Sequence, residues 1–172
     1  MEPGANIMTV EKRWRQDHTG FTLLEVLIAV LILSIGLLGL ASLQANGLRS
    51  NFSSYARSQA VILANDMADR IRANPVQAAA PIGAYNNIAA TTGDPGCLLA
   101  DCTPAQMVSH DIATWYTNLQ NTLPQGTGTI VGNGTVFTIS VMWDDNRDGA
   151  VGAGCGAAVS ATEGCFSTTF IP

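Results

Sequence analysis

Residues 21–41 read FTLLEVLIAVLILSIGLLGLA, an apolar run whose one charged residue is Glu25. A helix of about 20 apolar residues spans the hydrocarbon core of a bilayer. Three basic residues stand between positions 12 and 15, and the next basic residue is Arg49. Because basic flanks remain in the cytoplasm, the run predicts one transmembrane segment, with residues 1–20 in the cytoplasm and the rest of the chain across the membrane.

The same run permits a second interpretation, a secretory signal peptide that is removed. Gly39-Leu40-Ala41 offers the small residues that signal peptidase prefers, and cleavage there would leave Ser42 as the first residue. The run is longer, however, than an ordinary signal core of about 7–15 residues. It also carries a carboxylate near its beginning, where a signal peptide gains nothing from it. We therefore expect a membrane anchor.

Glu25 needs a partner. Inserting an ionised side chain into a membrane helix costs about 2.5–3.5 kcal/mol, so such a residue is a functional candidate by default. Cleavage between Gly20 and Phe21 would create an α-amino cation one helical turn before Glu25, in the same chain or beside a neighbouring chain. Between chains, that pair would fix the axial register of packed helices. The alternative is that Glu25 reaches to the headgroups near the cytoplasmic end of the helix.

The sequence GFTLLE at 20–25, with basic residues before it and the apolar run after it, resembles the processing signal of type IV prepilins. The resemblance implies that a prepilin peptidase cleaves after Gly20 and N-methylates Phe21. It also implies that Glu25 forms a salt bridge with the N-terminus of a neighbouring subunit during assembly. The chain would first be a single-pass protein of the inner membrane with its head in the periplasm, and then part of an extracellular pilus.

Beyond the apolar run, the sequence predicts that the same helix continues to about Ala73, because Pro75 disfavours helix at the residue before it. Residues 74–102 lack strong periodicity, and we expect a loop that links the helix to a sheet. Thr103 and Pro104 have the residue types of an N-cap and a first helical position. They predict a second, shorter helix, which a later proline ends.

Apolar residues recur at helical spacing in both helices and mark their expected buried faces. In the long helix these residues are Ala56, Ala60, Leu63, Met67 and Ile71. In the short helix they are Val108, Ile112, Trp115 and Leu119. We expect Trp115 to be a core anchor and His110 to be an exposed or satisfied side chain, so both would be structural.

Three strands are expected after the short helix, at residues 128–131, 135–143 and 165–171. The first two flank Asn133-Gly134, and Asn-Gly between β-branched runs is a strong hairpin signal. In the second strand, one face would pack on the long helix, and its alternating residues are Phe137, Ile139, Val141 and Trp143. In the last strand, Phe166 and Phe170 share a face.

The predicted fold class is α+β and pilin-like, with a long N-terminal helix, membrane-spanning in its first half, packed on a small antiparallel sheet with an extra short helix. The expected domains are a cytoplasmic leader at 1–20, a transmembrane and filament-core half of the long helix at 21–44, and a periplasmic globular head at 45–172.

The four cysteines all lie beyond the apolar run, at Cys97, Cys102, Cys155 and Cys165. An even number of cysteines in small loops indicates disulfides formed in an oxidising compartment. A zinc site is the competing interpretation, but only the first pair comes close to the usual spacing of zinc ligands. Four cysteines allow three pairings, and we expect the local one, Cys97–Cys102 with Cys155–Cys165.

Charge and motifs exclude several functions. The net charge is -5 and the chain has no lysine after residue 20, which argues against a nucleic-acid partner. No nucleophile elbow, P-loop or HExxH motif occurs, so we expect no enzyme and no catalytic residue. Asp144, Asn146 and Asp148 fit D-x-N-x-D-G, the opening of a calcium loop, but Cys155 replaces the glutamate that would complete an EF-hand. We expect a polar turn and no metal or cofactor, and these three residues are the ligands if calcium binds.

Among prepilins, the chain resembles the PilV group of type IV pilus modification proteins. The likeness rests on a cysteine pair before a Trp-containing helix, on Leu-Pro-x-Gly at 123–126 and on Val-x-Trp-Asp at 141–144. It implies a minor pilin that initiates the pilus or belongs to its tip complex. The implied partners are the prepilin peptidase, other minor and major pilins, the inner-membrane assembly platform, the lipid bilayer and a tip adhesin.

Three other functions remain open at this point. A pseudopilin of a type II secretion system would share the processing signal and the anchor. A secreted periplasmic binding domain behind a conventional signal peptide would begin at Ser42. An exported calcium-binding module would use the loop at Asp144.

Overall fold

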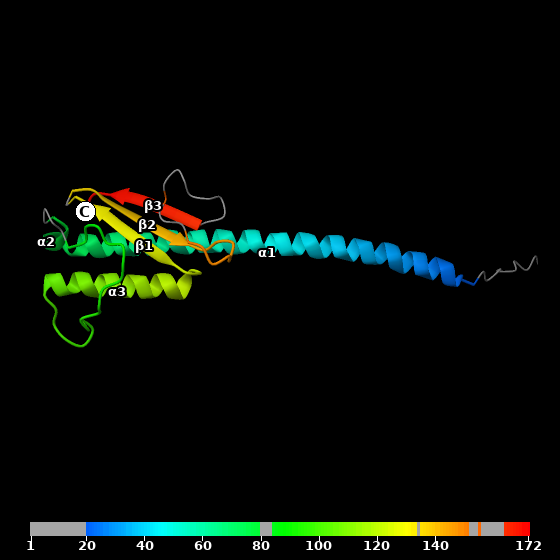
Figure 1. Cartoon of the computed structure of the whole chain (residues 1–172), viewed down its shortest axis with the longest axis horizontal. Coiled ribbons are helices and arrows are strands. Elements are labelled where there is room, and N and C mark those ends of the chain that lie inside the picture. The colour runs from blue at the N-terminus through cyan, green and yellow to red at the C-terminus, as the bar shows by residue number, and fades with distance from the viewer. Residues whose placement is uncertain (1–19, 80–83, 134, 152–154, 156–163) are drawn as a thin grey trace, which may run out of the picture. The chain divides into compact units, whose positions relative to one another are not determined.

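The computed structural model describes residues 20–79, 84–133, 135–151, 155 and 164–172. Its helices are α1 (Leu23–Ala73), α2 (Pro75–Ala78) and α3 (Pro104–Thr122), and its strands are β1 (Thr127–Gly132), β2 (Phe137–Trp143) and β3 (Gly164–Phe170) (Figure 1). The chain divides into two units, Met1–Ala45 and Asn46–Pro172. The predicted α+β class is confirmed: a long N-terminal apolar helix packs on a three-stranded antiparallel sheet, with an extra short helix. The rest of the predicted leader, residues 1–19, and Gly134 of the predicted turn lie outside the described residues.

α1 changes character along its length. Every residue from 20 to 51 is exposed, although most of the side chains between Phe21 and Leu43 are large and apolar. From Ala56 onwards one face is buried, and it includes all five residues that helical spacing predicts. The small residues Ala60 and Ala64 are fully buried on this face and let neighbouring elements approach the helix closely. The helix ends at Ala73, as the following Asn-Pro pair predicts.

The sheet has the order β1-β2-β3, and both neighbouring pairs are antiparallel. Phe137, Ile139, Val141 and Trp143 are all buried, which confirms the alternating face predicted for β2. The predicted start of this strand is wrong, because residues 135 and 136 belong to the connection. The side-chain oxygen Oδ1 of Asn133 accepts the backbone N–H groups of Thr135 and Val136, at 3.0 and 2.8 Å, and holds both outside the ladder.

β2 ends at Trp143 as predicted, and both ends of β1 and of β3 differ from the prediction by one residue. β1 extends to Thr127 and Gly132, and β3 runs from Gly164 to Phe170. Residue-type patterns identify strands better than their ends, because the ladder register decides where pairing stops. The register joins Ile130 to Ile139 in the first pair.

α3 begins as predicted. Thr103 is its N-cap, Pro104 is in the first turn, and Thr103 and Gln106 form a reciprocal capping box. The four predicted apolar residues of its inner face are all buried. The helix ends at Thr122, just before Leu123 and Pro124.

The predicted loop at 74–102 is only partly correct. It contains the short helix α2 and an antiparallel bridge between Ile88 and Ile130, and it leads to α3 before the sheet begins. Tyr85, which the sequence analysis did not single out, is fully buried. Apolar residues do not recur at regular spacing in this segment, because single residues pack on other elements. Its structure therefore depends on tertiary contacts.

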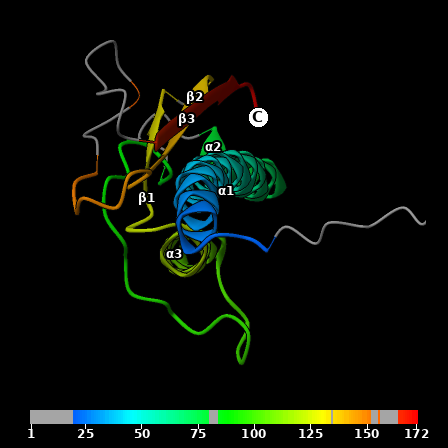
Figure 2. The same cartoon turned by 90° about the vertical axis from the view of Figure 1, so that its right-hand side faces the viewer.

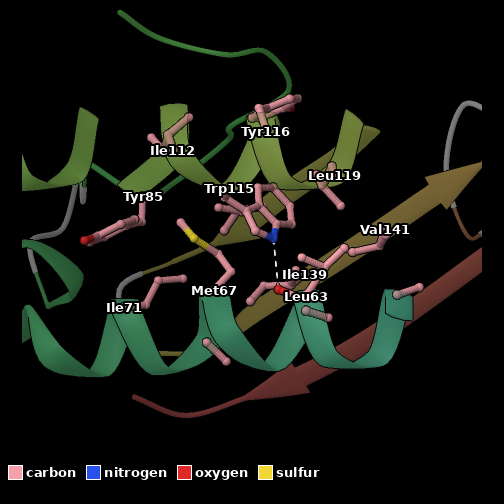
Figure 3. Close-up of a cluster of buried hydrophobic side chains, with 14 of the residues drawn as sticks. Leu63, Met67, Ile71, Tyr85, Ile112, Trp115, Tyr116, Leu119, Ile139 and Val141 are labelled. Carbon is pink, nitrogen blue, oxygen red and sulfur yellow. Dashed lines mark hydrogen bonds between the residues drawn. The ribbon is translucent and has the colours of Figure 1, made fainter. Parts of the chain in front are cut away.

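One core lies between the second part of α1, α3 and the sheet (Figure 3). Figure 2 shows α3 and the sheet on different sides of α1. Trp115 is the predicted core anchor: its side chain is fully buried, and its Nε1 donates to the backbone oxygen of Leu63 at 2.9 Å. Gly128 of β1 lies against this ring, where an added Cβ would collide with three ring carbons of Trp115. The tryptophan therefore links all three layers.

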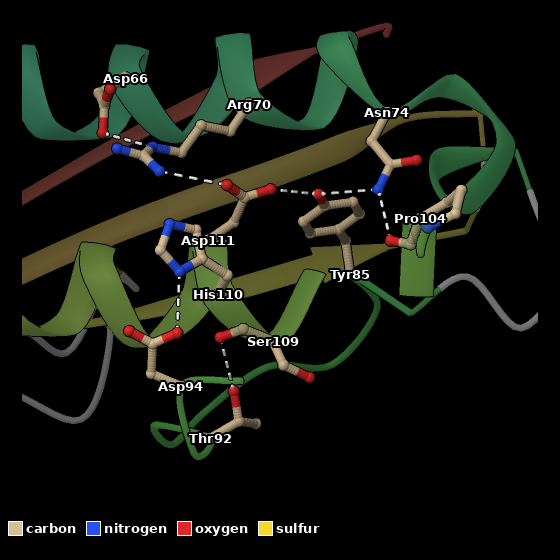
Figure 4. A network of polar contacts seen from close by, with 10 residues as sticks. All are labelled: Asp66, Arg70, Asn74, Tyr85, Thr92, Asp94, Pro104, Ser109, His110 and Asp111. Carbon is tan, nitrogen blue, oxygen red and sulfur yellow. Dashed lines mark hydrogen bonds and ion pairs between the residues drawn. The ribbon is translucent and has the colours of Figure 1, made fainter. Parts of the chain in front are cut away.

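A polar cluster joins α1, α3 and the connecting segment at one side of this core (Figure 4). The buried carboxylate of Asp111 accepts from the hydroxyl of Tyr85 at 2.6 Å and from Nη1 of Arg70 at 3.2 Å. Arg70 also donates from Nε to Asp66 at 2.9 Å, so it is not the simple surface residue that its place off the apolar face suggests. Burial, followed by the bond to Asp111, raises the pKa of Tyr85, so its hydroxyl stays a neutral donor. Asn74 closes the cluster with a bond from Nδ2 to the backbone oxygen of Pro104 at 2.8 Å.

We predict that Asp111→Ala destabilises the protein by about 2–4 kcal/mol, because it leaves a buried hydroxyl and a partly buried guanidinium without their shared acceptor. Asp69→Ala is the matched control, since Asp69 pairs with Arg72 at 2.8 Å on an exposed surface. The control should lower the free energy of unfolding by about 0.5 kcal/mol or less. Urea unfolding of the disulfide-intact, detergent-solubilised chain measures both values. Equal losses for the two variants would contradict the role given to the cluster.

Candidate processing and assembly site

The motif residues lie at the start of α1. Gly20, Phe21 and Thr22 precede the helix and are not helical, and the side chain of Phe21 is 83% exposed. α1 begins at Leu23, which places Glu25 in its first turn. The peptide bond between Gly20 and Phe21 therefore belongs to exposed, non-helical backbone, the kind of segment that a protease reaches.

Thr22 caps the helix, a role that the sequence analysis did not assign. The backbone N–H of Glu25 lies 3.3 Å from Oγ1 of Thr22 and 3.1 Å from its backbone oxygen. The T-x-x-E pattern of residues 22–25 is the sequence signal that indicates such a cap. A carboxylate in the first turn also interacts favourably with the positive end of the helix dipole. Glu25 thus has a local stabilising role in addition to any partner in another chain.

The apolar part of α1 has no cover from the described residues. An 18-residue window of this helix has a mean hydropathy of 2.8 and none of it is buried, so by length and composition it is able to cross a membrane. A signal sequence near an N-terminus passes the same test. Large contiguous apolar surfaces mark contact with lipid or with other proteins. This half of the helix must therefore be covered by something outside the described part of the chain.

His110 has a structural environment, as predicted. It is buried on α3, and its Nδ1 lies 2.9 Å from Oδ1 of Asp94. The same oxygen accepts the backbone N–H of Gly96 at 2.8 Å. The bond from His110, and then the bond from Gly96, lower the pKa of Asp94. The pair ties the segment before α3 to that helix.

The calcium-loop residues form a compact turn. The carboxylate of Asp144 accepts the backbone N–H groups of Asp148 and Gly149 at 3.2 and 2.9 Å. Nδ2 of Asn146 donates to Asp148 at 2.7 Å. Among the residues that the structure describes, no group of three or more His, Cys, Asp or Glu side chains could hold a metal ion. The predicted polar turn accounts for these bonds, and calcium binding by the three residues stays the untested alternative.

Both disulfides have the local pairing expected from the sequence. Cys97 is bonded to Cys102 and Cys155 to Cys165, and no free cysteine remains for a zinc site. The first bridge closes a small loop before α3, and the second ties the segment before β3 to that strand.

Comparison with known families matches two adjoining parts of the chain. Residues 15–41 match the prokaryotic N-terminal methylation motif, which includes the apolar run and the motif at 20–25. Residues 42–113 match the Tt1218-like family, described as type IV pilin Tt1218. No curated protein and no solved structure matches the chain. One match is thus to a methylation motif and the other to a type IV pilin family, and neither points to the PilV group.

The matched motif, the uncovered apolar helix and the α+β head all indicate a pilin. The role of the chain is structural and not enzymatic, and its general partners are the prepilin peptidase and other pilins. It is an inner-membrane prepilin first and a component of the pilus afterwards. The chain belongs to the type IV pilin family and carries that family's N-terminal methylation motif.

Proposed function

We propose that this pilin is a minor pilin, which acts in the initiation complex or tip complex of a type IV pilus. The observation that carries the proposal is the start of α1, where an exposed cleavage segment, a first-turn carboxylate and an uncovered apolar helix follow one another directly. The minor role itself is supported by the PilV-like features of the head, which comprise the cysteine pair before α3, Leu-Pro-x-Gly at 123–126 and Val-x-Trp-Asp at 141–144.

In this proposal the chain has three parts with different surroundings. Residues 1–20 are a cytoplasmic leader that is removed, 21–44 lie in the bilayer and later in the filament core, and 45–172 form the periplasmic head. The basic residues between 12 and 15 support this orientation. The two disulfides support it as well, because both lie in the head and such bonds persist in oxidising compartments.

Processing creates the charge that assembly needs. The prepilin peptidase cuts after Gly20, and the new α-amino group of Phe21 is cationic at neutral pH because its ordinary pKa is about 7.7–8.0. N-methylation of Phe21 retains a basic amine. In the bilayer, Glu25 lies near the cytoplasmic headgroups. In the filament, the same carboxylate pairs with the amine of a neighbouring subunit, and a wrong axial register would leave two unpaired charges in an apolar bundle.

The specific partners follow from this placement. The inner-membrane assembly platform would add the processed subunit, and the other minor and major pilins would surround its helix. A tip adhesin would dock on the head. The lipid bilayer is the first partner of the apolar segment, because a run of this length matches the hydrocarbon core.

The N-terminus of the protein recovered from its native host tests the proposed processing. We expect N-methyl-Phe21, which mass spectrometry of the N-terminal peptide detects directly. An unmodified chain that starts at Ser42 would instead indicate a conventional signal peptide and remove the proposal. Gly20→Leu is the matched variant: it blocks access of the peptidase to its small residue, so the leader should stay attached.

A strain that lacks the native gene and carries a Glu25 variant tests the proposed assembly role. Glu25→Gln keeps the size of the side chain but leaves the amine of Phe21 unpaired, which costs about 3–5 kcal/mol in a buried setting. Surface pili should therefore decrease by more than about tenfold, while the N-terminus remains N-methyl-Phe21. Ser34→Ala is the control, since the Ser34 hydroxyl only donates to Val30 O in its own helix, at 2.7 Å.

Electron microscopy of pili and an assay of protein secretion distinguish the outcomes of the Glu25 experiment. Normal piliation with Glu25→Gln would contradict the assembly role. Intact pili with lost secretion of exported proteins would identify the chain as a pseudopilin of a type II secretion system.

A further inference from the structure

The loop closed by the first disulfide carries two solvent-exposed leucines. Residues 97–102, here called the leucine knob, read CLLADC, and Leu98 and Leu99 are 85% and 95% exposed. Single exposed apolar residues are common on protein surfaces. Two adjacent ones at the tip of a covalently closed loop form a small apolar surface that projects into solvent.

The leucine knob is held in place from both sides. The bond between Cys97 and Cys102 closes it, and the backbone N–H of Leu99 donates to the oxygen of Gly96 at 3.0 Å. Gly96 has φ = 79°, a conformation that glycine adopts without strain. Asp94, which pairs with His110 on α3, bonds the N–H of this glycine. A loop fixed in this way loses little conformational freedom when it binds a partner.

A groove of complementary character lies elsewhere on the head. This surface, here called the basic groove, has a volume of about 860 Å³ and lies between the α1 segment 48–53 and the loop 145–147. Its apolar lining includes Leu48 and Phe52, and its basic lining includes Arg49 and Arg147. The volume falls in the range of about 300–1,000 Å³ that is usual for binding pockets.

The walls of the basic groove are fixed by contacts between its two sides. The hydroxyl of Ser53 donates to Asp145 at 2.8 Å, and Nε1 of Trp143 donates to the other oxygen of that carboxylate at 2.9 Å. The guanidinium of Arg147 lies over the ring of Phe52, 4.4 Å from its centre. Both donors are neutral, so Asp145 keeps its negative charge, and the lining carries two arginines against one aspartate, a net charge of +1.

The charges of the two surfaces match. Within the described residues, neither Arg49 nor Arg147 has an ion-pair partner, and the same holds for the exposed Asp101 of the leucine knob. The leucine knob is thus an apolar tip beside an acidic residue, and the basic groove is an apolar surface beside basic residues, so the two are complementary. Complementary charges at the rim of an apolar contact give orientation and specificity.

The two surfaces lie at different ends of the head. In Figure 1 the green loop before α3 lies at the end where α3 begins, and the orange loop after β2 lies beside α1 towards the other end. One head therefore cannot fill its own groove with its own knob. A contact between different surfaces of two copies is head-to-tail, and repetition of such a contact produces an open helical chain.

We propose that the leucine knob of one copy of this protein inserts into the basic groove of a second copy. Leu98 and Leu99 lie against Leu48 and Phe52, and Asp101 pairs with Arg49 and Arg147. This self-contact goes beyond the minor-pilin role and requires that copies of this subunit lie next to one another. It does not depend on the processing of Phe21, so the N-terminal peptide tests the proposed function separately.

The test is site-specific photo-cross-linking of the full chain in membranes that contain it. Leu99→p-benzoylphenylalanine places a photoreactive ring at the tip of the knob. We expect cross-linked dimers whose joined peptides carry residues 48–53 or 145–147. The same substitution at Val76, which is 70% exposed on α2, is the control and should not capture these peptides.

Charge exchange gives the second readout. Asp101→Arg and Arg49→Glu should each lower the dimer yield about tenfold, because each places like charges opposite one another. The double variant should yield more dimer than Asp101→Arg alone, because the exchanged charges at positions 101 and 49 attract each other while Arg147 is unchanged. Arg57→Glu, a change of an exposed arginine outside the groove, should not alter the yield. Adducts of Leu99 with lipid alone, with a different protein, or with another surface of a second copy would overturn the proposal. A double variant that yields no more dimer than Asp101→Arg alone would overturn the charge pairing.

Discussion

The structure depends on one constraint, which is that the first half of α1 exposes an apolar surface that the described residues do not cover. Fifteen large apolar side chains lie between Phe21 and Leu43, and all of them are exposed. The hydrophobic effect disfavours such a surface in water, so lipid and later the helices of other subunits must cover it. In that setting a lone carboxylate is tolerated only with a partner or at the headgroups. The position of Glu25 in the first helical turn allows both.

The same helix serves a different purpose in its second half. From Ala56 to Ile71 its buried face forms one wall of the head, where Trp115 packs and where Asp111 binds Arg70 and Tyr85. Covalent and polar contacts then fix the segments with little core of their own: a disulfide closes the leucine knob, and Asp145 holds the loop beside α1. The head therefore offers fixed surfaces at two places, which is what a subunit that docks on other subunits requires.

Regular spacing is sufficient to predict the buried faces of α1, α3 and β2, because burial on a helix or strand repeats with the backbone. It does not predict single residues whose position depends on distant partners. Tyr85 is buried by contacts with α1 and α3, and the basic groove unites Ser53 with Asp145, 92 positions apart. Among the candidate site residues, the disulfide pairing follows from local spacing. The T-x-x-E pattern is a sequence signal for the Thr22 cap. The cap was not predicted because Glu25 was assigned only a role in the membrane and in assembly.

The central claim is that the amine of Phe21 in one subunit neutralises Glu25 in another. Residues 21–172 contain no lysine, so after cleavage this amine is the only one that the chain offers to a zero-length carbodiimide cross-linker. The measurement is mass spectrometry of cross-linked pili assembled from mixed light and heavy isotope-labelled subunits. The expected product is an amide between Phe21 and Glu25 that joins a light peptide to a heavy one. Recovery of Glu25 without such an amide, with the Phe21 amine free or joined to other carboxylates, would contradict it.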